Sequence, residues 1–301
     1  DCSGKIDLNT WHTHFQSLFQ QDDYDSNNNA DNVDVDDENV NYVLNRRISE
    51  EEVIRAVKNL KLGKAGGLDG ILSEMLKAGK HIIILFLTDL FNVIFDKGTY
   101  PTAWAKAVIV PIFKKGAEEC PDNYRGISLL SITSKCFTAI LNHRLYSWLE
   151  EENKIVENQA GFRRNYSTTD HIFTLHAIVQ SILNKKGRKL YVAFVDFKKA
   201  FDSVHHNKLL EMLQNEDVNG KFFCTLKSMY ESLKSCVRVD GKFTDFFNCP
   251  RGVRQGCVLS PTLFSLFINQ LAKHVSESGR HGIQLMPGLM ELFILLFADD
   301  I

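Results

Sequence analysis

The sequence lacks the features that mark several common classes of protein. Its seven cysteines include no Cys-x-x-Cys pair, which argues against a zinc knuckle and favours reduced thiols inside the cell, in the cytoplasm or the nucleus. Its most apolar stretch, residues 82–95, is interrupted by polar residues and is too short to cross a bilayer. The Gly-Lys pair at residues 63–64 lacks the leading glycine and the following Ser or Thr of a P-loop. With 301 residues, 44% of them hydrophobic, the chain is expected to fold as one large or two small globular domains.

Net charge is also nearly absent, at −2, which by itself is unusual for a nucleic-acid-binding protein. The charge is unevenly divided, however. Residues 1–50 contain eleven acidic and three basic residues, a net charge of −8, so residues 51–301 carry +6. The acidic segment 22–38 has the composition of a disordered linker, and a calcium loop is disfavoured there because residues 34–39 lack the turn glycine. Before this segment, residues 11–19 are predicted to form a short amphipathic helix.

Local patterns predict several further elements. Ser49 and Glu52 have the spacing of a capping box and predict a helix that begins at residue 50. Ser260 is predicted to cap another helix, with Pro261 at its first position. The remaining pattern predicts helices at 72–78, 82–95, 134–151 and 167–184, and short strands around 108–113 and 237–247.

Two acidic sites follow strand-like runs about a hundred residues apart. Asp196 follows the run 190–195 and precedes a predicted helix, whereas Asp299 and Asp300 follow the run 289–297. Clustered carboxylates repel one another unless cations neutralise them. Mg²⁺ prefers oxygen ligands, and a pair of such ions is the usual clamp for displacement at phosphorus. The pattern therefore favours a divalent-cation site, although an Asp-Asp pair alone is more often a solvated turn.

Six short motifs occur in a fixed order, and both acidic sites belong to them. They are Pro-Ile-Phe-Lys-Lys-Gly (111–116), Asn-Tyr-Arg-Gly-Ile-Ser-Leu-Leu (123–130), Gln-Ala-Gly-Phe-Arg (159–163), Phe-Val-Asp-Phe-Lys-Lys-Ala-Phe-Asp (194–202), Arg-Gly-Val-Arg-Gln-Gly-Cys-Val-Leu-Ser-Pro-Thr-Leu-Phe (251–264) and Phe-Ala-Asp-Asp (297–300). In sequence and order this set resembles the reverse transcriptases of non-LTR retrotransposons over roughly residues 48–301. Residues 64–71 are similar to a family loop that usually has prolines where this chain has Gly66 and Leu68, so the loop is expected to be less stiff.

The resemblance implies an α+β fold with the fingers and palm of a right-hand polymerase. Residues 1–47 would be the acidic linker with its short helix, 48–190 the fingers and 191–301 the palm. The palm is expected to be incomplete and the thumb absent, because the hairpin at Asp299 and Asp300 would need a returning strand after Ile301. Without that strand the chain is expected to bind RNA in a salt-sensitive manner but to lack polymerase activity.

The resemblance also implies roles for individual residues. Asp196, Asp299 and Asp300 would be the catalytic carboxylates, holding two Mg²⁺ ions that Mn²⁺ could replace. Asp202 would brace the following helix, and Lys115 is a rival to Lys114. Nucleotide-binding residues would be Lys114, Arg125, Phe201, Gln255 and Gly256, and template-binding residues Gln159, Phe162 and Arg163. The ring of Phe201 would lie under the sugar, leave no room for a 2′-hydroxyl and so select deoxynucleotides.

The function that follows from the resemblance is RNA-templated DNA synthesis within a retrotransposon polyprotein. The partners would be an RNA template, a DNA primer and dNTPs, and the primer 3′-hydroxyl would attack the α-phosphorus. Two alternatives stay open. A viral RNA-dependent RNA polymerase shares the palm chemistry, although Phe201 disfavours it. A catalytically inactive transposon remnant would at most bind RNA.

Overall fold

The computed structural model describes residues 6–20, 40–278, 282–283 and 291–301. The chain divides into two compact units, one made of Asp1–Trp148 and Phe201–Ser260 and the other of Leu149–Ala200 and Pro261–Ile301. Each unit combines two stretches that are distant in sequence, whereas the fingers and palm expected from the motifs are successive segments. The predicted acidic linker at 22–38 and the first two residues of the predicted strand 289–297 lie outside the described residues.

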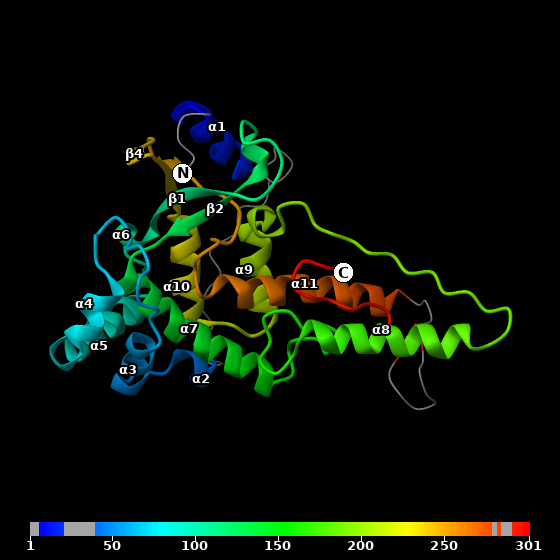
Figure 1. The fold of residues 1–301 in the computed structure, drawn as a ribbon. Helices are drawn as coiled ribbons and strands as arrows, with labels where there is room; N and C mark the ends of the chain where they lie inside the picture. The colour runs from blue at the N-terminus through cyan, green and yellow to red at the C-terminus, as the bar shows by residue number, and fades with distance from the viewer. Residues whose placement is uncertain (1–5, 21–39, 279–281, 284–290) are drawn as a thin grey trace. The chain divides into compact units, whose positions relative to one another are not determined.

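The described part of the first unit contains a mixed sheet of five short strands (Figure 1). They are β1 (Lys106–Phe113), β2 (Tyr124–Leu129), β3 (Lys234–Val239), β4 (Lys242–Phe243) and β5 (Phe247–Asn248). The strand order is β2-β1-β3-β4, and β5 also pairs with β3. Strand β1 runs antiparallel to β2, with Ile112 opposite Arg125, and parallel to β3, with Lys106 opposite Lys234. Strands β1 and β3 confirm the predictions around 108–113 and 237–247.

The helices confirm most of the sequence-based boundaries. Those that lie in or begin in the first unit are α1 (Leu8–Leu18), α2 (Tyr42–Asn45), α3 (Glu50–Lys58), α4 (Ser73–Ala78), α5 (Lys80–Lys97), α6 (Thr102–Ala105), α7 (Ile132–Glu151), α9 (His206–Asn215), α10 (Gly220–Glu231) and α11 (Ser260–Glu277). Helix α8 (Thr168–Leu183) belongs to the second unit, and short 3-10 turns occur at Pro121–Asn123 and Ala200–Ser203. The predicted capping box of α3 is present, because Ser49 and Glu52 bond to each other's backbone N–H groups. Ser260 begins α11, but its hydroxyl has no hydrogen-bond partner among the described residues, so the predicted cap bond is not formed.

Aromatic side chains form the centre of the first unit. The rings of Phe91 on α5 and Phe137 on α7 lie 5.3 Å apart, and Trp104 on α6 contacts both. Tyr100 joins this cluster, and its hydroxyl lies 2.6 Å from that of Ser134. Burial raises the pKa of Tyr100 well above its ordinary value, so the phenol stays protonated and available for that hydrogen bond. The cluster fixes α5 and α7 beside the start of β1.

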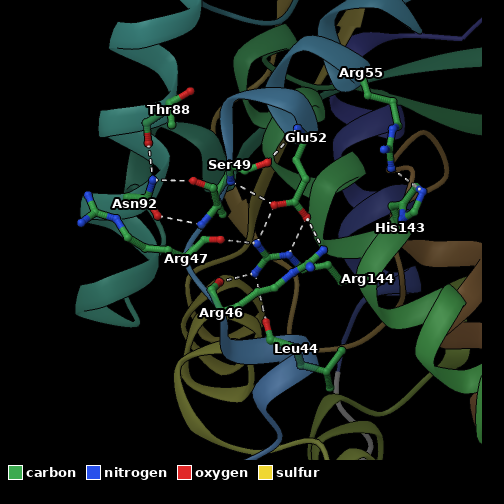
Figure 2. A network of polar contacts seen from close by, with 11 residues as sticks. Leu44, Arg46, Arg47, Ser49, Glu52, Arg55, Thr88, Asn92, His143 and Arg144 are labelled. Atoms are coloured by element: carbon green, nitrogen blue, oxygen red, sulfur yellow. Dashed lines mark hydrogen bonds and ion pairs between the residues drawn. The ribbon is translucent and has the colours of Figure 1, made fainter.

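A buried arginine joins α7 to the chain ahead of α3 (Figure 2). The Arg144 side chain is 1% exposed and donates to both carboxylate oxygens of Glu52, at 2.8 and 2.7 Å. It also donates to the main-chain carbonyls of Leu44, Arg46 and Arg47. Burial alone would raise the pKa of Glu52, but the hydrogen bonds from Arg144 and from the Ser49 N–H hold it below its ordinary value. Removing either partner of such a pair would leave an uncompensated buried charge, which is strongly destabilising.

Two predictions near Asp196 are wrong. Residues 190–195 do not form a strand, and several of their side chains are exposed, Tyr191 by 87% and Phe194 by 81%. A strand needs a ladder of partners, and the described backbone bonds of this run are two, both between Val195 and Ile301. The segment after Asp196 forms only the 3-10 turn Ala200–Ser203 before α9 begins at His206.

Among the described helices, none has the length and apolar character that crossing a membrane requires.

Candidate active site

Asp196 and Asp300 lie opposite each other in the second unit. The Val195 N–H donates to the Ile301 carbonyl at 2.8 Å, and the Ile301 N–H donates to the Val195 carbonyl at 3.0 Å. These two bonds make Asp196 and Asp300 a directly facing antiparallel pair. Because the pair itself carries no hydrogen bond, its Cα atoms belong to the closer class, about 4.5 Å apart, with both side chains on one face. Two acidic residues from distant motifs are thereby brought together.

Asp299 lies in a tight turn next to this pair. The Phe297 N–H donates to the Asp300 carbonyl and the Asp300 N–H to the Phe297 carbonyl, at 2.9 and 3.1 Å. Ala298 and Asp299 are therefore the two central residues of a hairpin turn, which confirms the prediction that the double aspartate lies at a hairpin tip. Ala298 has a φ of 58°, a left-handed conformation that favours glycine. Asp299 is half-buried and Asp300 is exposed.

Asp196 and Asp300, at paired backbone positions, carry carboxylate oxygens of the kind that Mg²⁺ prefers as ligands. Carboxylates that are brought close together repel one another, and a bound cation would relieve that repulsion. In the described part of the chain, however, no group of three or more His, Cys, Asp or Glu side chains is close enough to hold a metal ion. The structure thus brings Asp196 and Asp300 together, and does not gather the three predicted carboxylates into one ligand cluster.

In the first unit, three of the five predicted nucleotide-binding residues lie in or against the loop that precedes α11, namely Phe201, Gln255 and Gly256. The Val253 N–H donates to the Phe201 carbonyl at 2.8 Å, and the Gln255 side chain lies 3.4 Å from both carboxylate oxygens of Asp202. The Gln255 carbonyl accepts from the Ser128 N–H on β2 at 2.8 Å. A Cβ on Gly256 would lie 2.5 Å from the Ser128 carbonyl oxygen, so only glycine fits this approach. Phe201 and the glutamine-glycine loop are therefore held together against β2.

The predicted phosphate-binding cations lie at the outer edge of the same sheet. Arg125 is an exposed residue of β2, and Lys114 is an exposed residue just after β1. The Lys114 N–H donates to the Asn123 carbonyl at 2.8 Å, which closes the connection between the two strands. Both cations are thus presented to solvent from paired strands, as an anion-binding role requires.

Of the three predicted template contacts, only Phe162 is exposed, by 48%. Gln159 is fully buried, and its side-chain amide bonds to the backbone of Ala298. The Arg163 side chain is 7% exposed, pairs with Glu150 at 2.9 and 2.7 Å and lies 4.1 Å over the ring of Tyr166. Burial alone would lower the pKa of Arg163, but the hydrogen bonds and charge of Glu150 raise it. Gln159 and Arg163 therefore serve internal contacts within the second unit.

Sequence reasoning missed the residue that anchors the glutamine-glycine loop. The Arg254 side chain is half-buried, and its guanidinium donates to the main-chain carbonyls of Trp104, Ala105 and Lys234, at the starts of β1 and β3. Loss of solvent around the guanidinium lowers the pKa of Arg254, because it disfavours the charged form. Its position beside Gln255 was the one sequence signal for a structural role. That signal is weak, because a basic residue in a loop is usually solvated.

The profile of the reverse transcriptase (RNA-dependent DNA polymerase) family matches residues 112–301. The chain belongs to this reverse transcriptase family. The family predicted from the six motifs is thereby confirmed. Every predicted site residue of this reverse transcriptase chain, from Lys114 to Asp300, lies inside the matched region.

Three of the similar proteins come from transposable elements of insects. The chain is 34% identical over 227 residues to the probable RNA-directed DNA polymerase from transposon BS of Drosophila melanogaster, which covers 74% of this chain and 25% of that protein. It is 32% identical over 258 residues to the RNA-directed DNA polymerase from mobile element jockey of the same species, covering 84% and 27%. It is 27% identical over 258 residues to the Pol polyprotein from retrotransposable element R2 of Nasonia vitripennis, covering 85% and 24%. This reverse transcriptase chain thus spans about a quarter of the length of these relatives.

Proposed function

We propose that the chain is the fingers and palm part of an enzyme that copies RNA into DNA within a non-LTR retrotransposon polyprotein. The observation that carries the proposal is the pairing of Asp196 with Asp300 by the Val195–Ile301 hydrogen bonds. This pairing supports the proposal, because two motif aspartates on one face could act on the same substrate. Residues 48–190 would correspond to the fingers and 191–301 to the palm. Such an enzyme would act in the cytoplasm or the nucleus.

Asp196, Asp299 and Asp300 are the proposed metal ligands. Two bound Mg²⁺ ions would supply Lewis-acid stabilisation for the attacking oxygen and the pyrophosphate leaving group. Asp196 and Asp300 offer their oxygens from facing backbone positions, and Asp299 contributes from the turn.

The residues of the first unit would bind the incoming dNTP. Lys114 and Arg125 are exposed cations that suit the triphosphate, with the planar guanidinium able to hold two oxygens at once. Phe201 would pack under the sugar and exclude a 2′-hydroxyl. The Gln255–Gly256 backbone, held against Ser128, would pack on the new base pair. Phe162 is the proposed stacking contact for the RNA template, because its ring is exposed.

One observation favours a second candidate, an inactive remnant that binds RNA. The described residues do not gather three carboxylates or other metal ligands at one point. Such a remnant would use the +6 charge of residues 51–301 to bind phosphates. Its RNA affinity would fall steeply with salt, and no chemistry would accompany the binding.

Primer extension separates the two candidates. The longest translation product that contains this chain is given an RNA template, an annealed DNA primer, dNTPs and Mg²⁺. Template-dependent growth of the primer, absent when the template or the metal is omitted, is the expected result. RNA binding without any extension in Mg²⁺ or Mn²⁺ would support the remnant and contradict the polymerase.

A further inference from the structure

Residues 158–161 lie along the run that leads into the double-aspartate turn. The Ala160 N–H donates to the Leu296 carbonyl at 2.8 Å, and the Leu296 N–H donates to the Asn158 carbonyl at 2.9 Å. The Asn158 side-chain amide donates to the Ile294 carbonyl at 2.9 Å. Gln159 and Leu296 are thereby paired as in a parallel sheet. All these residues belong to the second unit, so the pairing ties the motif at 159–163 to the approach of the turn.

The Gln159 side chain continues this pairing into the turn itself. Its Oε1 accepts from the N–H groups of Ala298 at 3.0 Å and Gly161 at 2.7 Å, and its Nε2 lies 3.4 Å from the Ala298 carbonyl oxygen. The side chain is fully buried. One amide thus contacts both polar groups of the Ala298 backbone, and its hydrogen-bonding capacity is directed inward.

Ala298 needs such support because of its backbone conformation. Its φ of 58° is one that residues other than glycine rarely adopt, and the residue is buried. Gly161 allows the close approach, because an added Cβ there would clash with the backbone nitrogen of Ala298 and lie 2.9 Å from Gln159 Oε1. Gln159 and Gly161 therefore form a contact surface that fits one conformation of the turn.

We propose that Gln159, with Gly161, is a positioning residue for the catalytic carboxylates. By fixing the Ala298 backbone, it sets the direction in which Asp299 and Asp300 leave the turn. The proposal rests on the proposed function for its catalytic consequence, but the contact of Gln159 and Gly161 with Ala298 is a property of the fold. Catalytic carboxylates have to be held within a fraction of an ångström of their working geometry, so a small rotation of this turn is costly.

The first test measures the hydrogen bond between Gln159 and Ala298 and does not depend on polymerase activity. Amide hydrogen exchange at Ala298 is compared between the parental protein and Gln159→Ala, with Gln180→Ala, an exposed glutamine on α8, as the matched control. Exchange at Ala298 should be at least about tenfold faster in Gln159→Ala, because its N–H loses its acceptor. Parental exchange in that variant would overturn the proposal, whether or not the protein has polymerase activity.

The second test distinguishes positioning from template binding. In Gln159→Ala, kcat for primer extension should fall by about tenfold to a hundredfold and the Mg²⁺ concentration for half-maximal rate should rise. The Kd for the RNA–primer duplex should stay within about twofold of the parental value, since the side chain is buried and bonded to the Gly161 and Ala298 backbone. A raised Kd with unchanged kcat and Mg²⁺ dependence would identify a template contact instead and overturn the proposal.

A second variant protects the test against misfolding. Gly161→Ala keeps the Gln159 amide but pushes a methyl group into the Ala298 backbone, so it should give the same loss of kcat and the same shift in Mg²⁺ dependence. Gln159→Glu keeps an acceptor for the two N–H groups and should restore part of the exchange protection. If the parental protein extends no primer, the proposed function fails. The exchange measurement still shows whether Gln159 holds the Ala298 backbone.

Discussion

Single buried polar residues determine how the first unit responds to pH. His206 lies against Tyr230, with ring centroids 4.8 Å apart, and its Nε2 is 2.9 Å from the Gly252 carbonyl oxygen. Burial lowers the pKa of His206 to about 4, and the charge of Arg254 adds to the effect. The neutral ring therefore donates to Gly252, within the loop that leads to Gln255, and protonation of the ring has to disrupt this packing.

The pH dependence of stability follows from the direction of this shift. The folded-state pKa of about 4 lies below the ordinary value of 6.5, so the unfolded chain binds the proton more tightly. The contribution of His206 is complete above pH 6.5 and is lost as the pH falls toward 4, by roughly 3 kcal/mol in total. In urea unfolding, His206→Gln should lose less of its free energy of unfolding than the parental protein as the pH falls from 6.5 to 4. An unchanged pH profile in that variant, or an equal change in the exposed control His176→Gln, would contradict the assignment.

Sugar selection is predicted to depend on the ring of Phe201. If this ring occupies the space of a 2′-hydroxyl, Phe201→Val should admit ribonucleotides and weaken the preference for dNTPs by about 1–3 kcal/mol. The measurement is kcat/KM for dNTP and rNTP incorporation opposite an RNA template. Phe243→Val, at an exposed ring on β4, is the matched control and should keep the parental preference. A parental ratio in Phe201→Val would mean that the ring is only part of the core.

At the scale of elements, helix α1 is packed on the sheet of the first unit. The ring of Trp11 is fully buried, stacks on Phe15 and meets Tyr124 of β2 with centroids 4.9 Å apart. A Cβ on Gly126 would lie 2.5 Å from the Phe15 ring, so the helix and the strand are in close contact. The amphipathic pattern at 11–19 predicts the helix, but only the structure shows its place against β2.

Removing the Trp11 ring should therefore detach α1. Trp11→Ala is expected to lower the free energy of unfolding by about 3–5 kcal/mol, the usual cost of deleting a large buried ring. Trp11→Phe should cost less, since the indole N–H has no hydrogen-bond partner among the described residues. Thermal or urea unfolding measures both, with the exposed Thr13→Ala as control. A loss below 1 kcal/mol in Trp11→Ala would show that α1 contributes little to this unit.

The accuracy of sequence prediction differs between local and distant interactions. The capping box of Ser49 and Glu52 is correctly predicted because its hydrogen bonds lie within four residues. The run 190–195 is apolar enough for a strand, yet strand formation depends on partners elsewhere in the chain, and its described backbone bonds are those to Ile301. The bonds of Arg144 to carbonyls about a hundred residues away leave no mark in a local pattern. The buried role of Gln159 is of the same kind.

For the whole molecule, the sequence motifs identify the family, and the structure determines which residues meet. The motif aspartates of the second unit and the glutamine-glycine loop of the first come from motifs that the resemblance assigns correctly to one family. Their division between two compact units depends on packing between distant stretches, which motif spacing does not encode. The exposed positions of Lys114, Arg125 and Phe162 agree with roles in binding charged and aromatic groups.

The most direct test of the proposed chemistry is primer extension by carboxylate variants. Asp196→Asn and Asp299→Asn, each made in the longest translation product that contains this chain, are compared on an RNA template with Mg²⁺. Asp245→Asn, at an exposed aspartate of the first unit, is the matched control. Each of the two motif variants should lose on the order of a thousandfold in rate, because metal-ion stabilisation of the displacement contributes several kcal/mol, while RNA binding stays near the parental value. Near-parental extension by either variant would contradict the assignment of these aspartates to catalysis.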